Sequence, residues 1–210
     1  MKVVFKISPR RALFPVAGLA AFLAVWGGLC AAPRAAAAQA VYFNTRELLT
    51  DFFQRSEHVG YRRIELTAFD RARLRTRLGY EVAKSSYTFF VAETAGKVDG
   101  YALIDDENGE HLPITFAVKI TPSGAVERQE IVAYREPRGD EVRDLGFRRQ
   151  FVGKTALDPI CPDRDIAVVS GATISSRAMA VGVKRALVLF DLFVRSGTLA
   201  ARAGAPPGKL

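Results

Sequence analysis

Four short runs rich in β-branched and aromatic residues follow one another between residues 85 and 134. They cover residues 86–94, 97–104, 112–120 and 125–134. Short strands joined by tight turns are typical of an antiparallel meander, because each strand can pair with its predecessor without a long crossover. The sequence therefore predicts an α+β fold, in which a twisted, half-barrel-like antiparallel sheet packs against helices.

Glycine marks the turns between the predicted strands. These turns are expected at residues 95–96, 105–109 and 122–124. One more strand is expected at Ile166 to Val169, where an apolar run follows a polar loop that contains Pro159 and Pro162. Because this run is apolar throughout, it indicates a buried strand.

Two helices are predicted before the sheet. The first covers residues 45–58 and has leucine and phenylalanine side chains at helical spacing. Thr67 is expected to cap the second, an arginine-rich helix over residues 68–78 that ends at Gly79. Such a helix is either a nucleic-acid patch or a solvated surface helix. A weak alternation over residues 61–66 indicates a strand between the two helices.

The longest predicted helix runs from about Ser175 to Ser196 and is apolar along most of one side. We expect it to cover the sheet. Charged residues interrupt that side, so it is not a membrane span. We interpret residues 85–199 as one domain, residues 41–84 as its helical N-terminal extension and residues 200–210 as a flexible tail.

The beginning of the chain has the pattern of an export signal. Basic residues precede an apolar run from Ala12 to Ala32, and a stretch of small residues ends at Ala40. Residues 1–40 are therefore predicted to be either a signal peptide or a retained N-terminal membrane anchor. Both alternatives place the remainder in the periplasm or on the extracytoplasmic face of the cytoplasmic membrane.

The positive charge of the chain is concentrated in this leader. The leader holds five of the 30 basic residues and none of the 22 acidic ones, so the net charge falls from +8 to about +3 without it. A folded part with so small a charge excess argues against nucleic acid as a partner. The two cysteines, Cys30 and Cys161, exclude a disulfide-rich scaffold.

Residues 170–173 (Ser-Gly-Ala-Thr), just before the longest helix, carry the strongest chemical signal. Small residues let the backbone approach a ligand closely, and the first turn of a helix offers unpaired N–H groups that favour an anion such as phosphate. Hydroxyl groups add to this corner at Ser170, Thr173, Ser175 and Ser176. In the alternative interpretation, Ser175 only caps the helix and Gly171 only makes the turn.

Together with other segments, this corner resembles the extracytoplasmic FMN-binding domain family, which occurs in the flavin subunits of the Rnf and Nqr ion-pumping reductases and in stand-alone exported proteins. The similarity extends over residues 97–190. The segments that carry it are Gly-Tyr-Ala at 100–102, the 112–120 strand with the turn at Gly124, Glu-Pro-Arg-Gly at 136–139, Phe-Arg-Arg-Gln-Phe-Val-Gly-Lys at 147–154 and Ser-Gly-Ala-Thr at 170–173.

The resemblance implies a cofactor, FMN, and a set of residues that bind it. In that family the last threonine of the motif, here Thr173, carries FMN through a phosphoester bond made by a flavin transferase that uses FAD. Lys154 is interpreted either as a counter-charge to the phosphate or as an ordinary surface lysine. The resemblance further implies that Glu136 contacts the flavin. The remaining cofactor-binding positions that it implies are Ser170, Gly171, Ala172 and Ser176. The family places an acidic residue six positions before the modified threonine, where this chain has Ala167 and the nearest acid is Asp165.

The resemblance predicts an exported electron carrier or redox subunit rather than a stand-alone enzyme, with redox partners in the membrane or periplasm. Two alternatives stay open: a subunit of an Rnf-like membrane complex, and an exported binding module without flavin. The chain has no catalytic triad, zinc-ligand spacing, haem-attachment motif or dinucleotide fingerprint. No catalytic or metal-binding residue is therefore predicted.

Overall fold

The computed structural model describes residues 40–198 and residues 208–209. The chain divides into two units, Met1–Arg34 and Ala35–Leu210, and all described residues belong to the second. The predicted leader therefore lies outside the described residues, apart from Ala40. So does the predicted tail, apart from Gly208 and Lys209.

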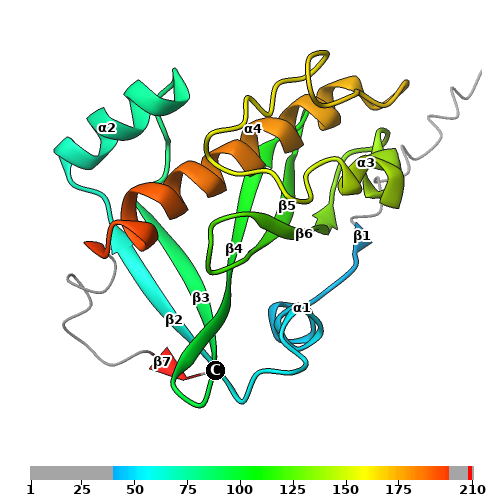
Figure 1. Cartoon of the computed structure of the whole chain (residues 1–210). Coiled ribbons are helices and arrows are strands. Elements are labelled where there is room, and N and C mark those ends of the chain that lie inside the picture. The colour runs from blue at the N-terminus through cyan, green and yellow to red at the C-terminus, as the bar shows by residue number, and fades with distance from the viewer. Residues whose placement is uncertain (1–39, 199–207, 210) are drawn as a thin grey trace, which may run out of the picture. The chain divides into compact units, whose positions relative to one another are not determined.

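A seven-stranded, wholly antiparallel sheet forms the centre of the described part (Figure 1). Its long strands are β2 (His58–Glu65), β3 (Ser86–Thr94), β4 (Lys97–Asn108), β5 (Pro113–Ile120) and β6 (Val126–Tyr134). Each of these pairs with the next along the chain. Two-residue strands lie at the edges, β1 (Ala40–Val41) beside β6 and β7 (Gly208–Lys209) beside β2. The predicted meander and the α+β class are confirmed.

The prediction for residues 41–84 as a helical extension is only partly right. The first helix, α1 (Thr45–Phe52), is shorter than expected, and β2 begins at His58. All eight residues of β2 pair with β3, so this segment is part of the sheet. The partner strand lies far along the chain, which is why local periodicity did not reveal the pairing.

The turn predicted at residues 105–109 is also wrong, because β4 continues through Asn108. Asp105 and Asp106 are of a residue type common in turns, but both lie in the strand. There, cationic side chains from outside the strand pair with their carboxylates. Lys84 pairs with both carboxylates, at 2.6 Å from Asp105 Oδ1 and 3.1 Å from Asp106 Oδ2. The turn is displaced to Gly109–Leu112, where the Gly109 N–H donates to the Leu112 carbonyl.

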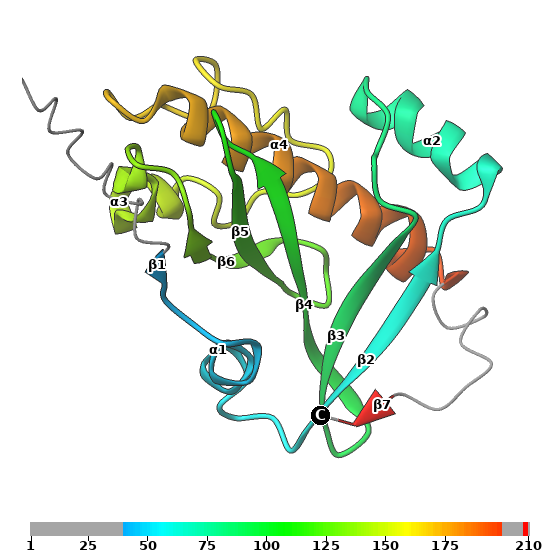
Figure 2. The ribbon, with the colours of Figure 1, turned by 180° about the vertical axis from the view of Figure 1, so that it is seen from behind.

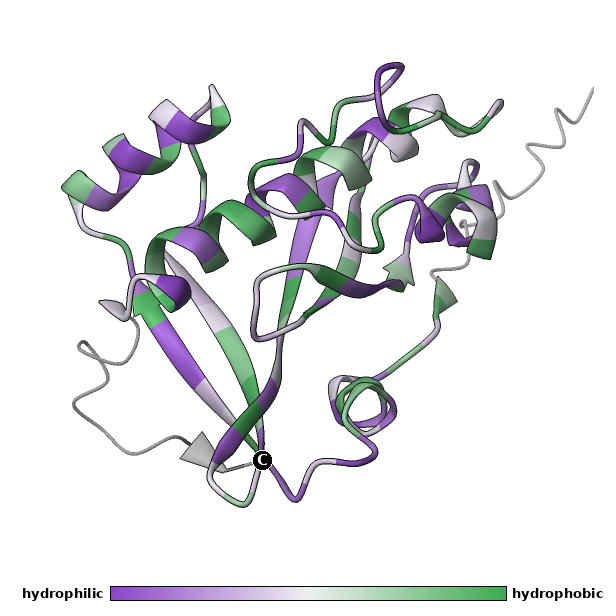
Figure 3. Cartoon of the chain, in the orientation of Figure 1, coloured by the Kyte–Doolittle hydropathy of each residue, from purple (hydrophilic) through white to green (hydrophobic). Residues whose placement is uncertain are grey.

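The arginine-rich helix α2 (Ala68–Leu78) forms as predicted. Thr67 and Asp70 make reciprocal side-chain bonds to each other's N–H groups at its start, and Gly79 ends it in the left-handed conformation at φ 82°. Such a capping box satisfies two first-turn donors. Its surface is mostly hydrophilic (Figure 3). Arg77 pairs with Asp191 at 3.1 Å, which ties α2 to the segment that follows the longest helix.

The longest helix, α4 (Thr173–Leu189), crosses one face of the sheet. It lies in front of β4 and β5 in Figure 1 and behind them in Figure 2. Gly182 allows the closest approach, since an added Cβ there would lie 2.5 Å from the Phe116 ring on β5. A π-helical segment, Phe190–Arg195, continues α4 and contributes to the same core. The predicted helix at about 175–196 is thus confirmed, with an earlier start.

The other face of the sheet is covered by α1. Leu48, Leu49, Phe52 and Phe53 pack there against alanine and valine side chains of β3 to β6. Two short helices follow β6, a 3-10 turn (Asp140–Arg143) and α3 (Leu145–Arg149). Among the helices of the described residues, none is long and apolar enough to cross a membrane.

Candidate functional site

The corner before α4 is a loop and not the end of a strand. The strand predicted at Ile166 to Val169 is wrong, since only an isolated bridge from Ile166 to Pro162 is present. Side chains replace the expected strand partners: Gln150 binds both the N–H and the carbonyl of Ala167, at 2.7 and 3.1 Å. The Val169 N–H donates to Ser176 Oγ at 3.1 Å. These backbone groups of Ala167 and Val169 are therefore satisfied without a sheet.

The N-terminus of α4 has free donors. Its N-cap is Ala172, whose methyl group accepts no hydrogen bond, so the alternative in which Ser175 caps the helix is wrong. The N–H groups of Thr173, Ile174 and Ser175 have no acceptor within residues 40–198. Gly171 turns the chain at φ 84° just before them. Orphan N–H groups and the helix dipole together favour an anion at this end.

A cavity of about 270 Å³ lies at this helix end. Three loops and the first turn of α4 line it, through Glu110, Glu136, Arg138, Gly139, Gly171, Ala172, Thr173, Ile174 and Ser175. Among the described residues that line it, Arg138 is the only cation. An anion held by the N–H groups of α4 therefore has a counter-charge from a different element.

Glu136 enters the cavity wall from the loop after β6. Its Oε1 atom accepts hydrogen bonds from the N–H groups of His111 and Leu112, at 2.6 and 2.9 Å. Its Oε2 atom is buried and has no hydrogen-bond partner within the described residues, although His111 Nδ1 lies 3.5 Å away. An added Cβ at Gly109 would lie 2.5 Å from Oε1, so the turn needs glycine there. A buried oxygen without a partner favours a hydrogen-bond donor from a ligand.

The four hydroxyl groups of the corner have different surroundings. Thr173 is exposed and lines the cavity. Ser170 is exposed but does not line it, and Ser176 is fully buried under the 167–169 loop. Ser175 lines the cavity but is buried, with its Oγ atom 2.7 Å from Tyr134 Oη. Of these four hydroxyl groups, that of Thr173 is the one that a ligand in the cavity can reach without a rearrangement of the protein.

The predicted site residues are thus only partly brought together. Thr173, Gly171, Ala172 and Glu136 meet at the cavity. Lys154 does not line the cavity, and its ammonium group pairs with Asp165 at 2.8 Å. Arg138 is the cation that lines the cavity among the described residues.

Sequence reasoning missed Arg138, Gly139 and Tyr134 as parts of this site. The first two lie two and three positions after Glu136 in the Glu-Pro-Arg-Gly segment, and this closeness in sequence was the signal that could have found them. Nothing local marks Tyr134, because its role depends on contacts with the Arg138 carbonyl and with Ser175, 41 residues away along the chain.

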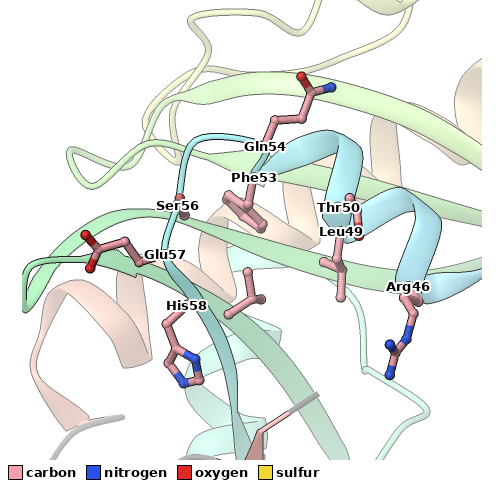
Figure 4. Close-up of a pocket in the computed structure, with 9 residues that line it drawn as sticks. Arg46, Leu49, Thr50, Phe53, Gln54, Ser56, Glu57 and His58 are labelled. Carbon is pink, nitrogen blue, oxygen red and sulfur yellow. The ribbon is translucent and has the colours of Figure 1, made fainter.

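A separate hollow of about 300 Å³ lies between α1 and β2. Figure 4 shows Arg46 and His58 on either side of it, with Leu49 and Phe53 between them. Within the described residues, none of the buried polar atoms that lack a partner belongs to its lining. The α4 cavity is therefore the candidate site, because unsatisfied polar groups gather there.

Comparison with protein families agrees with this assignment. Residues 109–188 match the FMN-binding domain family, from the Gly109 turn to the C-terminal part of α4. The chain contains an FMN-binding domain. The match includes every element that lines the cavity, and it confirms both the resemblance inferred from sequence and FMN as the cofactor.

A solved structure shows the same fold. NqrC of Shewanella oneidensis is similar over 76% of this chain and 90% of its own, with 17% sequence identity and a TM-score of 0.50. The corresponding subunit of the Na⁺-translocating NADH-quinone reductase of Parabacteroides distasonis is 18% identical over 68% of this chain and 84% of its own, with a TM-score of 0.39. No curated protein sequence matches the chain.

The Glu136 carboxylate is expected to make stability depend on pH. Burial alone would raise the pKa of Glu136, but the N–H groups of Leu112 and His111 lower it below its ordinary value of 4.5. Because the folded-state pKa is depressed, the contribution is present above pH 4.5 and is lost as the pH falls through the folded pKa. Glu136→Gln should therefore lower the free energy of unfolding at pH 7. The difference in this free energy between the wild type and the variant should become smaller as the pH falls. Urea unfolding of both proteins at several pH values measures this.

Glu110→Gln is the matched control for that comparison. Glu110 lines the same cavity, but it is exposed and its carboxylate makes no hydrogen bond within the described residues. Its substitution should leave stability nearly unchanged at every pH. A Glu136→Gln deficit that stays constant from pH 7 down to pH 3 would show that ionisation of Glu136 does not stabilise the fold.

Proposed function

We propose that this chain is an exported electron-transfer flavoprotein. In this proposal the domain holds FMN in the periplasm or on the extracytoplasmic face of the cytoplasmic membrane, and it exchanges electrons with redox partners in the membrane or periplasm. FMN supplies the redox chemistry, while the protein positions it and sets its surroundings. The FMN-binding domain and the fold shared with NqrC support the proposal.

The observation that carries the proposal is the set of unsatisfied groups around Thr173. The phosphate of FMN would lie at the N–H groups of α4, with Arg138 as its counter-charge. Glu136 would accept a hydrogen bond from a hydroxyl or N–H of the same molecule. Its negative charge keeps the phosphate at the α4 side of the cavity, since two anions repel each other.

We further propose that FMN is covalently attached to Thr173. The Thr173 Oγ atom would attack the FMN phosphorus of FAD on a flavin transferase. An Oγ–P bond forms, the pyrophosphate P–O bond breaks, AMP leaves and the hydroxyl proton is released, with no change of oxidation state. The exposure of Thr173 supports this step. Asp165 does not offer the transferase a substitute for the acid absent at Ala167, because its carboxylate binds Lys154 and the N–H groups of Ile160 and Cys161.

A covalent bond has a physical advantage outside the cytoplasm. Occupancy of a reversible site depends on the ratio of free ligand to Kd, so it falls where free FMN is scarce. An attached cofactor does not depend on that ratio. A retained leader would in addition hold the domain by its N-terminus beside membrane partners, whereas a cleaved leader would release it.

The test is made on the full chain, with and without a coexpressed flavin transferase. Chain produced without the transferase should bind added FMN and quench its fluorescence. Chain produced with it should be yellow and gain the mass of one FMN less one water; the intact mass also shows whether the leader is cleaved. Bound flavin that leaves on denaturation would limit the proposal to a reversible carrier. A chain that binds FMN in neither preparation contradicts the proposal and favours the binding module without flavin.

A further inference from the structure

The hydroxyl group of Tyr134 lies at a junction behind the candidate site. Tyr134 is the last residue of β6 and is 3% exposed. Its Oη atom donates to the Arg138 carbonyl at 2.5 Å and lies 2.7 Å from Ser175 Oγ. A phenol has one proton, so Ser175 donates in the second bond. One buried oxygen thereby joins the end of β6, the loop that carries Arg138 and the first turn of α4.

The backbone of Gly139 passes close to this junction. Gly139 has a left-handed φ of 91°, which glycine adopts without strain. An added Cβ there would lie 2.7 Å from both Ser175 Oγ and Tyr134 Oη. The loop can therefore come this close to α4 only because position 139 has no side chain.

This junction contains groups on which the proposed phosphate site depends. Arg138 is the only cation among the described lining residues, and the Tyr134 hydroxyl donates a hydrogen bond to the carbonyl of that same residue. Ser175 supplies one of the free N–H groups of α4, and its side chain binds the same phenol. Burial raises the pKa of Tyr134, although the Ser175 hydrogen bond lowers it in part, so the hydroxyl keeps its proton at neutral pH.

We infer that Tyr134 is a positioning residue, whose hydroxyl holds the Arg138 loop against the first turn of α4 and so pre-forms the phosphate end of the FMN site. The inference rests on the proposed function, because it assigns the phosphate to this end of the cavity. Pre-organisation of this kind lowers the conformational cost of binding. The effect of Tyr134 on affinity should therefore depend on the phosphate and not on the ring of the ligand.

The test compares Tyr134→Phe with the wild-type full chain, produced without a flavin transferase, using FMN and riboflavin as probes. Riboflavin lacks the phosphate. The variant should bind FMN about tenfold more weakly, as expected for one buried hydrogen bond, and riboflavin as the wild type does. Tyr101→Phe is the matched control, since Tyr101 packs against Phe190 at 5.2 Å, beyond the C-terminal end of α4. It should change neither affinity.

Amide hydrogen exchange without ligand tests the junction independently. Exchange at Ser176, whose N–H donates to the Ala172 carbonyl at 2.8 Å at the start of α4, should be about tenfold faster in Tyr134→Phe, with β3 to β5 unchanged. Unchanged exchange overturns the junction. Faster exchange with an unaltered ratio of FMN to riboflavin affinity overturns the positioning role. A wild-type chain that binds neither probe overturns the proposed function, and the exchange result still decides whether the junction exists.

Discussion

Thr173→Ala is expected to abolish covalent flavin attachment completely. Of the four hydroxyl groups in the corner, Thr173 alone is both exposed and part of the cavity wall. No neighbouring hydroxyl should replace it, because Ser175 is engaged with Tyr134 and Ser176 is buried under the loop. The measurement is flavin fluorescence on a denaturing gel, together with intact mass, for full chain coexpressed with a flavin transferase.

Two further variants make that experiment specific. Thr173→Ser keeps an attacking hydroxyl and should retain some attachment. Ser170→Ala removes an exposed hydroxyl that lies outside the cavity lining and should behave as the wild type does. Fluorescence that persists on the Thr173→Ala chain would move the attachment to another residue. The reversible FMN affinity of the same variant should change little, because the N–H groups that favour the phosphate belong to the backbone.

Arg185→Met is expected to destabilise the fold by about 3–5 kcal/mol, the effect of breaking a buried ion pair from one side. The Arg185 guanidinium, 8% exposed, donates to Asp105 Oδ2 from two nitrogens, at 2.9 and 2.7 Å, and also binds Glu107. Burial alone would lower the pKa of Arg185, but the carboxylates of Asp105 and Glu107 raise it above its usual value. Removing the guanidinium leaves the buried Asp105 carboxylate with Lys84 as its remaining cation, and leaves the half-buried Glu107 carboxylate without an ion pair within the described residues.

Urea unfolding of the full chain measures this loss. Arg71→Met, on the exposed surface of α2, removes an arginine that has no ion pair within the described residues and should cost little. The double variant Asp105→Asn with Arg185→Met should lose less than the sum of the two single variants, because the two side chains act on each other. Additive losses, or an Arg185→Met chain as stable as the wild type, would show that the pair does not hold α4 to β4.

Local patterns identified many of the elements correctly. The meander followed from short runs rich in β-branched and aromatic residues and from glycine turns, and α2 followed from Thr67 at its start and Gly79 at its end. The corner before α4 was found from its small residues and hydroxyls. These features depend on neighbours within a few positions, so they are readable from one sequence.

The wrong predictions have one cause in common, which is a side-chain partner outside the local pattern. Asp105 was assigned to a turn because its partner Arg185 lies 80 residues away along the chain. Ile166 to Val169 was assigned to a strand because the side chain of Gln150, which takes the place of a strand partner, is 17 residues from Ala167. Lys154 was chosen as the phosphate counter-charge because its ion pair with Asp165 was not visible in the pattern.

The amino-acid sequence was sufficient to predict an antiparallel sheet, a covering helix and a corner of small and hydroxyl-bearing residues before that helix, since strand-forming composition, capping and backbone freedom are local properties. Long-range packing determined which side chains share that corner. The pairing of β4, β5 and β6 and the seating of α4 bring Glu136, Arg138 and Thr173 to one cavity, leave Thr173 accessible and turn Lys154 away. Such convergence depends on contacts between residues tens of positions apart, and no periodicity within one segment encodes them.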